Sequence, residues 1–558
     1  MLNMIVQKKV FKKQPNIVII LADDMGFNDI SFQGSNQIPT PNIDAIAAMG
    51  IKLNKMYVAP MCTPSRSCLL TGKYESNLGM QHFVIAPNQP FGLPFEEKTL
   101  PQYLKEVGYR NYLIGKWHLG IFEKRYTPLH RGFDSHFGYL GPFIDYWDHS
   151  LKMPSPNASS GFDMRKNFTV NWESKGTYAT DLFTDEAINT IKTHDHSTPM
   201  FLLMSHLAPH TANEYDPMQA PDDEIEKFNY IRDENRRIYA AMVSKLDTSV
   251  GKVVKALSES NMLDNTVILF MADNGAPVVG QHANSGSNFP FKGQKDSPWE
   301  GAVRSAAAIW STTLQARQRI SNQMIHITDW LPTFAKLAGA DVKTSIDGKN
   351  IWSALSLNKG NPRKNLLCHH DILTPYMSYI SGTYKYVSGT TYNGRYDDWL
   401  SSYSDTSEEN DIFGRTYAQT ILESDVGQAL YKFSFSRNES YKNEIGNQGI
   451  TISEINELRR TSKITCKNIT KSSIDSPYYC NATVSPCLFD LSNDPCEMRN
   501  IAHERPDILA RLKERVDSYG KIAKRPRNQP LDPRADPSYY GGIWTWWYDE
   551  IKNAQSIA

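Results

Sequence analysis

The sequence predicts an α/β protein in which a large, mixed but mostly parallel sheet is sandwiched by helices and is followed by a smaller α+β domain. Apolar runs at 16–22 and 266–272 are continuous, rich in β-branched residues and bounded by turn formers. Such runs are typical of strands that a parallel sheet buries on both faces. Helical segments alternate with these runs, and this alternation predicts helices on both faces of one sheet.

Several elements have their own local signals. Thr40 followed by Pro41 predicts a helix that begins near 41, because proline suits the first helical position. A long amphipathic pattern predicts a second helix over 230–260. Further apolar runs at 109–115 and 199–205 predict two more strands.

The chain has 558 residues, more than the roughly 250–300 that a single core usually supports. We therefore expect a polar tail at 1–14, a catalytic α/β domain at 15–360 and a smaller domain at 361–558. The last part is expected to hold strands near 378–387, a cysteine-rich segment, a terminal helix at 506–520 and an aromatic tail at 543–548. Burial of that tail against the larger domain is favoured over a glycan platform.

Composition excludes some classes of function. The formal net charge is zero, whereas nucleic-acid binding usually shows as a basic excess. No stretch approaches the roughly 20 apolar residues that span a membrane. The apolar run at 1–6 is too short for the core of a signal peptide, so no clear signal peptide is present in this sequence.

Cysteine usage nevertheless favours the secretory pathway. Four of the seven cysteines lie within 466–496, with spacings that lack the short pairs of a zinc site. We expect disulfides there, between Cys466 and Cys480 and between Cys487 and Cys496. Five Asn-x-Ser/Thr sequons point the same way, at Asn157, Asn167, Asn438, Asn468 and Asn481.

Oxygen ligands follow two of the predicted strands. Asp23 and Asp24 follow the first apolar run, and Asp273 and Asn274 follow the run that ends at 272. Ligands of open α/β sheets sit beyond the carboxyl ends of the strands, so these side chains are expected at one rim. Carboxylates and an amide oxygen suit a hard cation, calcium or magnesium.

Cationic and imidazole side chains follow the other two strands. Lys116 and His118 come after one, and would share a face if the chain stayed extended. His206 and His210 come after the other, and Lys295 lies in the loop beyond Asp273. A metal site combined with these side chains indicates a site for an oxyanion. We favour His210 over His206, because it follows Pro209 and lies further over the rim.

The segment 62–72 carries the most specific motif. Cys62 is followed at fixed offsets by Pro64 and Arg66, and the segment ends in Leu-Leu-Thr-Gly. Pro64 places Cys62 at a helix N-terminus, where the dipole and free N–H groups favour an anion. The segment resembles the sulfatase signature, whose cysteine is oxidised to the aldehyde formylglycine. Further likeness to the sulfatase family, and to its arylsulfatase B-like animal members, lies at 21–26, 115–120, 131–134, 328–333 and 487–491.

This resemblance implies an alkaline-phosphatase-like fold and roles for particular residues. One calcium ion would be held by five residues, Asp23, Asp24, Asp273, Asn274 and the modified Cys62. Catalysis and sulfate binding would fall to Cys62, Arg66, Lys116, His118, His210 and Lys295. A formylglycine-generating enzyme is then a partner during maturation.

The implied activity is hydrolysis of a sulfate ester to an alcohol or phenol plus sulfate. One hydroxyl of the aldehyde hydrate would attack sulfur and the other would later expel sulfate. A phosphoesterase of the same superfamily and a non-catalytic sulfoglycan-binding protein are the alternatives. The substrate would be a sulfated sugar such as N-acetylgalactosamine 4-sulfate, or a small molecule such as a glucosinolate. The resemblance also implies a lysosomal or extracellular localisation, the gut lumen included. The oligomeric state stays open.

Overall fold

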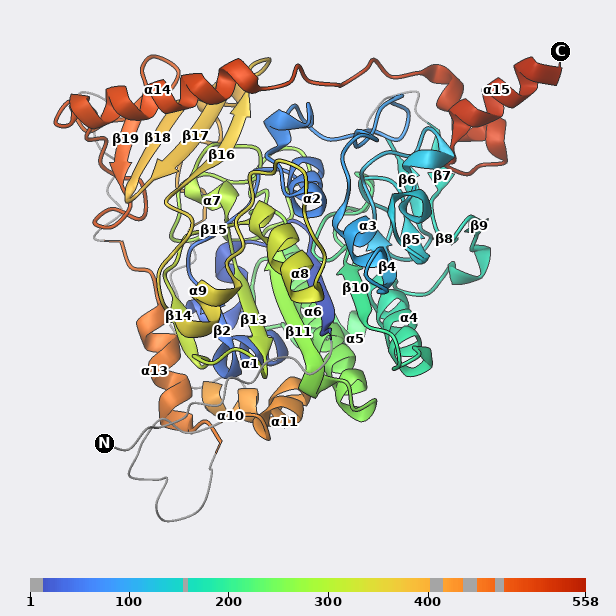
Figure 1. The fold of residues 1–558 in the computed structure, drawn as a ribbon, viewed down its shortest axis with the longest axis horizontal. Coiled ribbons are helices and arrows are strands. Elements are labelled where there is room, and N and C mark those ends of the chain that lie inside the picture. Colours follow the sequence, from blue (N-terminus) through green and yellow to red (C-terminus); the bar gives the residue numbers. More distant parts are fainter. Residues whose placement is uncertain (1–13, 154–158, 402–414, 435–448, 467–475, 558) are drawn as a thin grey trace.

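A computed structural model describes residues 14–557, except 154–158, 402–414, 435–448 and 467–475. Its main feature is a ten-stranded sheet in the order β14-β2-β13-β11-β1-β10-β4-β5-β8-β9 (Figure 1). The run from β11 to β5 is parallel, whereas β13 pairs antiparallel with β11. The predicted mixed, mostly parallel sheet is therefore confirmed. Its strands are β1 (Asn16–Ala22), β2 (Ile51–Leu53), β4 (Arg110–Lys116), β5 (Ser135–Tyr139), β8 (Arg165–Lys166), β9 (Thr169–Val170), β10 (Met200–Ser205), β11 (Thr266–Ala272), β13 (Ala307–Ser311) and β14 (Arg319–Ser321).

The central strands end level with one another. Every residue of β1, β10 and β11 is buried, as their continuous apolar sequences require. Leu21 of β1 pairs with Ser205 of β10, which pairs in turn with Gly115 of β4. On the other side Ala22 pairs with Ala272 of β11. This register brings the polar residues that follow all four strands to one rim.

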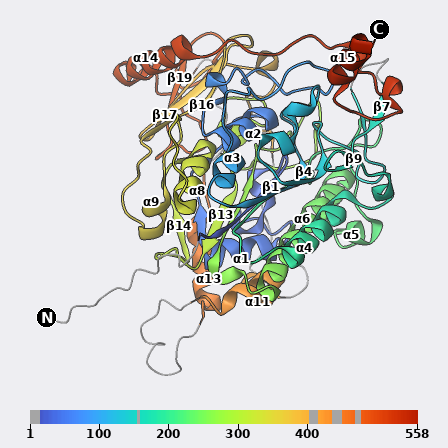
Figure 2. The same cartoon turned by 45° about the vertical axis from the view of Figure 1, so that its right-hand side comes forward.

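Two groups of helices cover the sheet (Figures 1 and 2). In one group, α1 (Pro41–Met49) and α4 (Ala179–Thr193) both pack against α6 (Glu234–Glu259). The other group packs α2 (Cys62–Thr71), α3 (Leu100–Lys105) and α8 (Trp330–Ala338) together. The amphipathic pattern over 230–260 thus forms α6, whose first turn is capped by the carboxylate of Asp233. No helix in the described part of the chain is long and apolar enough to cross a membrane.

A second sheet follows the first in sequence and carries its own helix. It is antiparallel, in the order β16-β17-β18-β19, and α14 lies along it at the upper left of Figure 1. The segment between β18 and β19 returns to the large sheet, where α10 and α11 pack against α1 and α13 packs against α10. The elements are β16 (Asn365–Asp371), β17 (Tyr376–Ser381), β18 (Tyr384–Gly389), α10 (Tyr417–Glu423), α11 (Asp425–Tyr431), α13 (Ile452–Ser462), β19 (Cys487–Asp490) and α14 (Pro506–Ile522).

The predicted disulfide pairing is wrong. The structure joins Cys480 to Cys487 and Cys466 to Cys496. Cys487 opens β19, and the short turn before it returns Cys480 to within 5.8 Å, measured between Cα atoms. Cys496 is then left facing the segment that follows α13. Spacing alone does not fix connectivity, because the turn before β19 has no distinctive sequence.

The aromatic tail packs against the rest of the protein with two of its three tryptophans buried, whereas Trp546 and Tyr548 stay partly exposed. Trp544 and Trp547 are at most 2% exposed. Their indole N–H groups donate to the backbone oxygens of Leu151 and Pro87, both within the larger domain. Trp547 also begins the last helix, α15 (Trp547–Ile557).

A buried ionic cluster ties the small sheet to the rim side of the large one. Lys385 of β18 lies 3.0 Å from Glu300 and 2.8 Å from Glu497, and all three side chains are inaccessible to solvent. Arg304 and the hydroxyl of Tyr57 complete the surroundings of Glu300 at 3.3 Å and 3.0 Å. The two glutamates hold the pKa of Lys385 well above its ordinary value, although burial opposes this.

Replacing Lys385 tests this cluster. We expect Lys385→Met to lower the free energy of unfolding by about 3–5 kcal/mol, because two buried carboxylates lose their shared cation. Lys359→Met, at an exposed position, is the control. Urea unfolding followed by intrinsic fluorescence measures both, and equal losses in the two variants would contradict the expectation.

Candidate active site

The acidic rim is built from the ends of β1 and β11. Asp23 and Asp24 follow β1, Asp273 and Asn274 follow β11, and all four are completely buried. Asp24 takes a left-handed conformation with φ 58°, which aspartate tolerates better than most residues. Its backbone N–H donates to Asp273 Oδ1 at 3.3 Å, so the two strand ends are joined directly.

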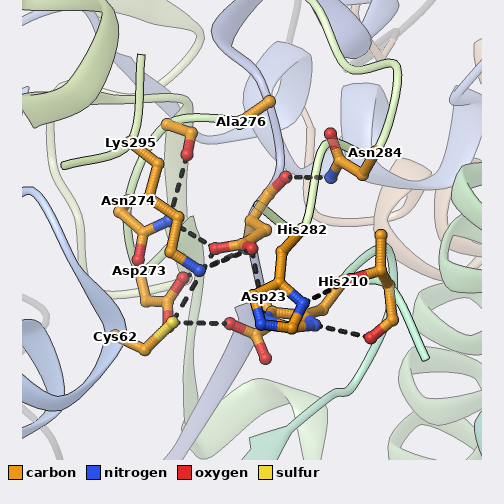
Figure 3. Close-up of polar contacts among 12 residues, drawn as sticks. Asp23, Cys62, His210, Asp273, Asn274, Ala276, His282, Asn284 and Lys295 are labelled. Carbon is orange, nitrogen blue, oxygen red and sulfur yellow. Dashed lines mark hydrogen bonds and ion pairs between the residues drawn. The ribbon is translucent and has the colours of Figure 1, made fainter. Parts of the chain in front are cut away.

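Four side chains converge at this rim. Ligand atoms of Asp23, Asp24, Cys62 and His210 all lie within 4.8 Å of one another. Cys62 Sγ is 3.3 Å from Asp23 Oδ1 and 3.7 Å from Asp24 Oδ1, and His210 Nε2 is 3.3 Å from Asp24 Oδ2 (Figure 3). Strands β1 and β10 and helix α2, far apart in sequence, therefore contribute to one cluster.

Three cations pair with the three carboxylates. Lys116 Nζ lies 2.6 Å from Asp23, and Lys295 Nζ lies 2.6 Å from Asp24. Arg66 donates to Asp273 Oδ2 through Nε at 3.1 Å and Nη2 at 2.8 Å. The formal charges of these six groups cancel. Burial would raise the pKa of Asp24, but the charge of Lys295 holds it well below its ordinary value.

Cys62 is the first residue of α2. Met61 occupies the N-cap position without a side-chain capping bond, and Cys62 is 1% exposed. Burial, together with the nearby Asp23, raises the pKa of its thiol well above the ordinary value. The thiol is therefore protonated at neutral pH and is a poor nucleophile.

The backbone at His118 differs from the extended chain considered in the sequence analysis. β4 ends at Lys116, and His118 is not extended but left-handed, with φ 58°. Its Nε2 faces the carbonyl oxygen of Ile85 at 3.0 Å and so carries the hydrogen. Nδ1 is buried without a hydrogen-bond partner among the described residues. Burial, with Lys116 and Arg66 nearby, holds the pKa of His118 well below its ordinary value, so Nδ1 presents a free lone pair.

The two histidines beyond β10 have different surroundings. His210 borders the same cavity as Cys62 and Lys295, and its Nδ1 lies 2.7 Å from the oxygen of Thr211. His206 lies beneath α6, where Nε2 is 3.3 Å from Ser249 Oγ. Burial lowers the pKa of each ring to about 3, with Lys295 and Lys116 contributing at His210. Both rings are thus neutral, and His210 is the one that the structure brings to the cluster.

A cavity of about 410 Å³ opens above Cys62. Cys62, His118, His210 and Lys295 line its floor, and it is large enough for a drug-sized molecule. Sequence reasoning missed its walls, which come from loops without a recognisable motif. They include Phe83, Phe143, His282, Asp296, Tyr392 and Tyr396.

The donor set at the rim fits a hard divalent cation. Asp23 and Asp24 supply carboxylate oxygens to one buried cluster. Asp273, also buried, lies beside it with Oδ1 3.3 Å from the backbone nitrogen of Asp24. Asn274 Nδ2 donates to Asp24 Oδ1 at 2.6 Å, whereas its Oδ1 is buried without a hydrogen-bond partner in the described structure. A buried carbonyl oxygen left unpaired is costly, and calcium prefers such oxygens.

Comparison with known proteins identifies the class. The Sulfatase family model matches residues 15–340. Arylsulfatase J of Mus musculus is 34% identical over 540 residues, which cover 96% of this chain and 81% of that protein. N-acetylgalactosamine-6-sulfatase of Rattus norvegicus is 30% identical over 406 residues, or 70% of this chain and 73% of that one.

A solved structure agrees over the whole length. The crystal structure of Ps i-CgsB in complex with k-i-k-neocarrahexaose has a TM-score of 0.69 and 25% identity, and covers 93% of this chain and 96% of its own. The chain therefore belongs to the sulfatase family and is a sulfuric ester hydrolase.

Metal binding at the rim can be tested without measuring activity. We expect Asp24→Ala to weaken calcium binding by at least about tenfold, because the cluster loses a charged oxygen ligand. The matched control is Asp264→Ala, an exposed aspartate just before β11, the strand that pairs with β1, and so at the opposite edge of the sheet. Equilibrium dialysis with calcium measures both variants, and wild-type affinity in Asp24→Ala would refute the assignment.

Proposed function

We propose that this sulfatase acts through a formylglycine made from Cys62 and one calcium ion. The observation that carries the proposal is the position of Cys62, at the start of α2, on the floor of the cavity and within 3.7 Å of two carboxylates. An unmodified thiol suits this place poorly, because its raised pKa leaves little thiolate for attack. Hydrated formylglycine would supply two hydroxyls on one carbon, one for attack on sulfur and one to expel sulfate.

The calcium ligands would be Asp23, Asp24, Asp273, Asn274 and the converted residue 62. When bound, calcium would draw electron density from the sulfate oxygens and stabilise the charge that develops on them. Conversion of Cys62 would also replace its sulfur, the one soft atom in this group of ligands, with oxygen.

Three cations would assist the reaction: Lys116 and Lys295 would hold the sulfate, and Arg66 would steady the aldehyde hydrate. Arg66, Lys116 and Lys295 surround the carboxylates, and their charges are fixed by short ion pairs. Preorganised donors of this kind stabilise developing negative charge more strongly inside a protein than in water. Lys295 also borders the cavity, so it is the cation that an entering sulfate ester meets first.

Proton transfer falls to two kinds of side chain. His118 has a free Nδ1 lone pair and is suited to take the proton from the hydroxyl that expels sulfate. The leaving oxygen would take its proton from Lys295, which is protonated beside Asp24, or from His210 once the bound sulfate anion has raised the pKa of its ring and protonated it.

Similar proteins favour a sulfated carbohydrate or another small sulfated molecule as substrate. One relative is named for N-acetylgalactosamine 6-sulfate, and one solved neighbour is in complex with k-i-k-neocarrahexaose. A suitable substrate panel comprises an aryl sulfate, N-acetylgalactosamine 4- and 6-sulfates, and a glucosinolate. None of the relatives compared above is named for the last of these.

The cysteines and sequons support maturation in the secretory pathway. Two disulfides are formed in the structure, and disulfides persist mainly in oxidising compartments. A formylglycine-generating enzyme would convert Cys62 there, before delivery of the protein to the lysosome or the exterior.

Mass spectrometry tests the nucleophile. In active protein, the peptide containing residue 62 should carry an aldehyde in place of the thiol. Cys62→Ala should lose turnover by at least about a thousandfold and keep its unfolding midpoint, since only one small side chain is removed. Cys68→Ala, a buried cysteine further along α2, is the matched control and should retain turnover. Full activity with only thiol at position 62 would refute the mechanism.

A second experiment separates His210 from His206. His210→Ala should lower kcat more for alkyl sulfates than for activated aryl sulfates, because a good leaving group needs less protonation. His206→Ala should instead lower stability and change kcat equally for both substrates, since its ring packs beneath α6. The reverse pattern would exchange the two assignments.

A further inference from the structure

The cavity above the sulfate-binding floor carries little positive charge. Lys295 is the one lysine or arginine among the described residues that line it. His282, in the wall, has its pKa lowered to about 3 mainly by burial and stays neutral. Lys295 is already paired with Asp24 at the floor. The walls therefore offer no cation to a second acidic group on the substrate.

Asp296 makes the wall negative instead. It follows Lys295 directly, lines the cavity and is 8% exposed. The hydroxyl of Tyr376 donates to its Oδ1 at 3.1 Å, and no lysine or arginine in the described part of the chain forms an ion pair with it. Burial raises the pKa of Asp296 to about 6, so the carboxylate is mostly ionised above pH 7. The site thus holds a carboxylate where recognition of a polyanion would require lysine or arginine.

Aromatic rings form the mouth. Phe83 is 40% exposed and Tyr392 is 51% exposed, and both line the cavity together with Tyr396. Phe83 has φ 50° and Tyr392 has φ 48°, a region that bulky residues rarely adopt. Backbone strain at positive φ persists only where the surrounding structure imposes it, and strained residues are common at ligand-binding sites. Unfavourable backbone geometry thus accompanies the two exposed aromatic rings at the mouth of the cavity.

We propose that this cavity selects a substrate with a single sulfate on an otherwise uncharged, ring-containing leaving group. Phe83 and Tyr392 would pack against the ring, and Asp296 would repel any second negative charge. This inference rests on the proposed function. It excludes long sulfated glycosaminoglycans as good substrates, because each neighbouring sulfate or carboxylate would meet Asp296 and no free cation.

Two substrates of equal size test the charge selection. One is 4-nitrophenyl sulfate with a ring carboxylate, and the other carries a carboxamide at the same position. Wild-type enzyme should prefer the carboxamide by at least about tenfold in kcat/KM above pH 7, as expected for repulsion between partly screened charges. Asp296→Asn should reduce that preference at least about threefold, since asparagine keeps a hydrogen-bond acceptor and tolerates the φ of 64°. An unchanged ratio would overturn the role of Asp296.

The aromatic mouth needs a separate variant. Phe83→Ala should raise KM for 4-nitrophenyl sulfate about fivefold with little change in kcat, because binding is lost without loss of chemistry. Phe95→Ala is the control, at an aromatic residue that is 39% exposed and lies outside the cavity lining. Equal KM values in the two variants would overturn the packing role.

If wild-type protein releases sulfate from none of these esters, the proposed function itself fails, whereas equal turnover of charged and uncharged esters defeats only the selection.

Discussion

The structure depends on three buried carboxylates that are neutralised at one rim of the sheet. Asp23, Asp24 and Asp273 are completely buried, and an isolated buried charge is costly. Each has a cation within 2.8 Å, supplied by Lys116, Lys295 or Arg66. Those cations come from β4, a distant loop and α2, so the charges can be balanced only if these elements meet at the ends of β1 and β11. The site and the fold therefore stabilise each other.

The later part of the chain shapes this rim as well. The loop that carries Lys295 and Asp296 is held from beyond β18, where the Asp398 oxygen accepts from Gly293 N and the Thr391 hydroxyl donates to the Asp296 oxygen. The buried contact of Lys385 with Glu300 fixes the other end of the same loop. The region after the large sheet thus positions Lys295 on the floor of the cavity and Asp296 in its wall.

The sheet and the floor of the site could be predicted because both follow from local patterns. Continuous apolar runs identify buried strands, and parallel strands must end at one edge, so the amino-acid pattern alone places Asp23 near Asp273. The left-handed turn at His118 and the aromatic mouth could not be predicted, since they depend on backbone conformations and loop contacts that no periodicity encodes. The disulfide prediction failed for the same reason: a turn before β19, rather than spacing, pairs Cys480 with Cys487.

Charge balance at the rim also links the metal to the substrate. The three carboxylates and three cations sum to zero, so this cluster alone exerts little net attraction on an anion. A divalent cation held there would leave an excess of two positive charges, enough to neutralise the developing charge of a sulfate group. Affinity for sulfate and affinity for the metal would then rise together, because linkage between two binding sites is reciprocal. The apolar and acidic walls above the rim do not attract an anion. In the proposed enzyme the rim alone would therefore bind the sulfate group, and the walls would select the leaving group to which it is attached.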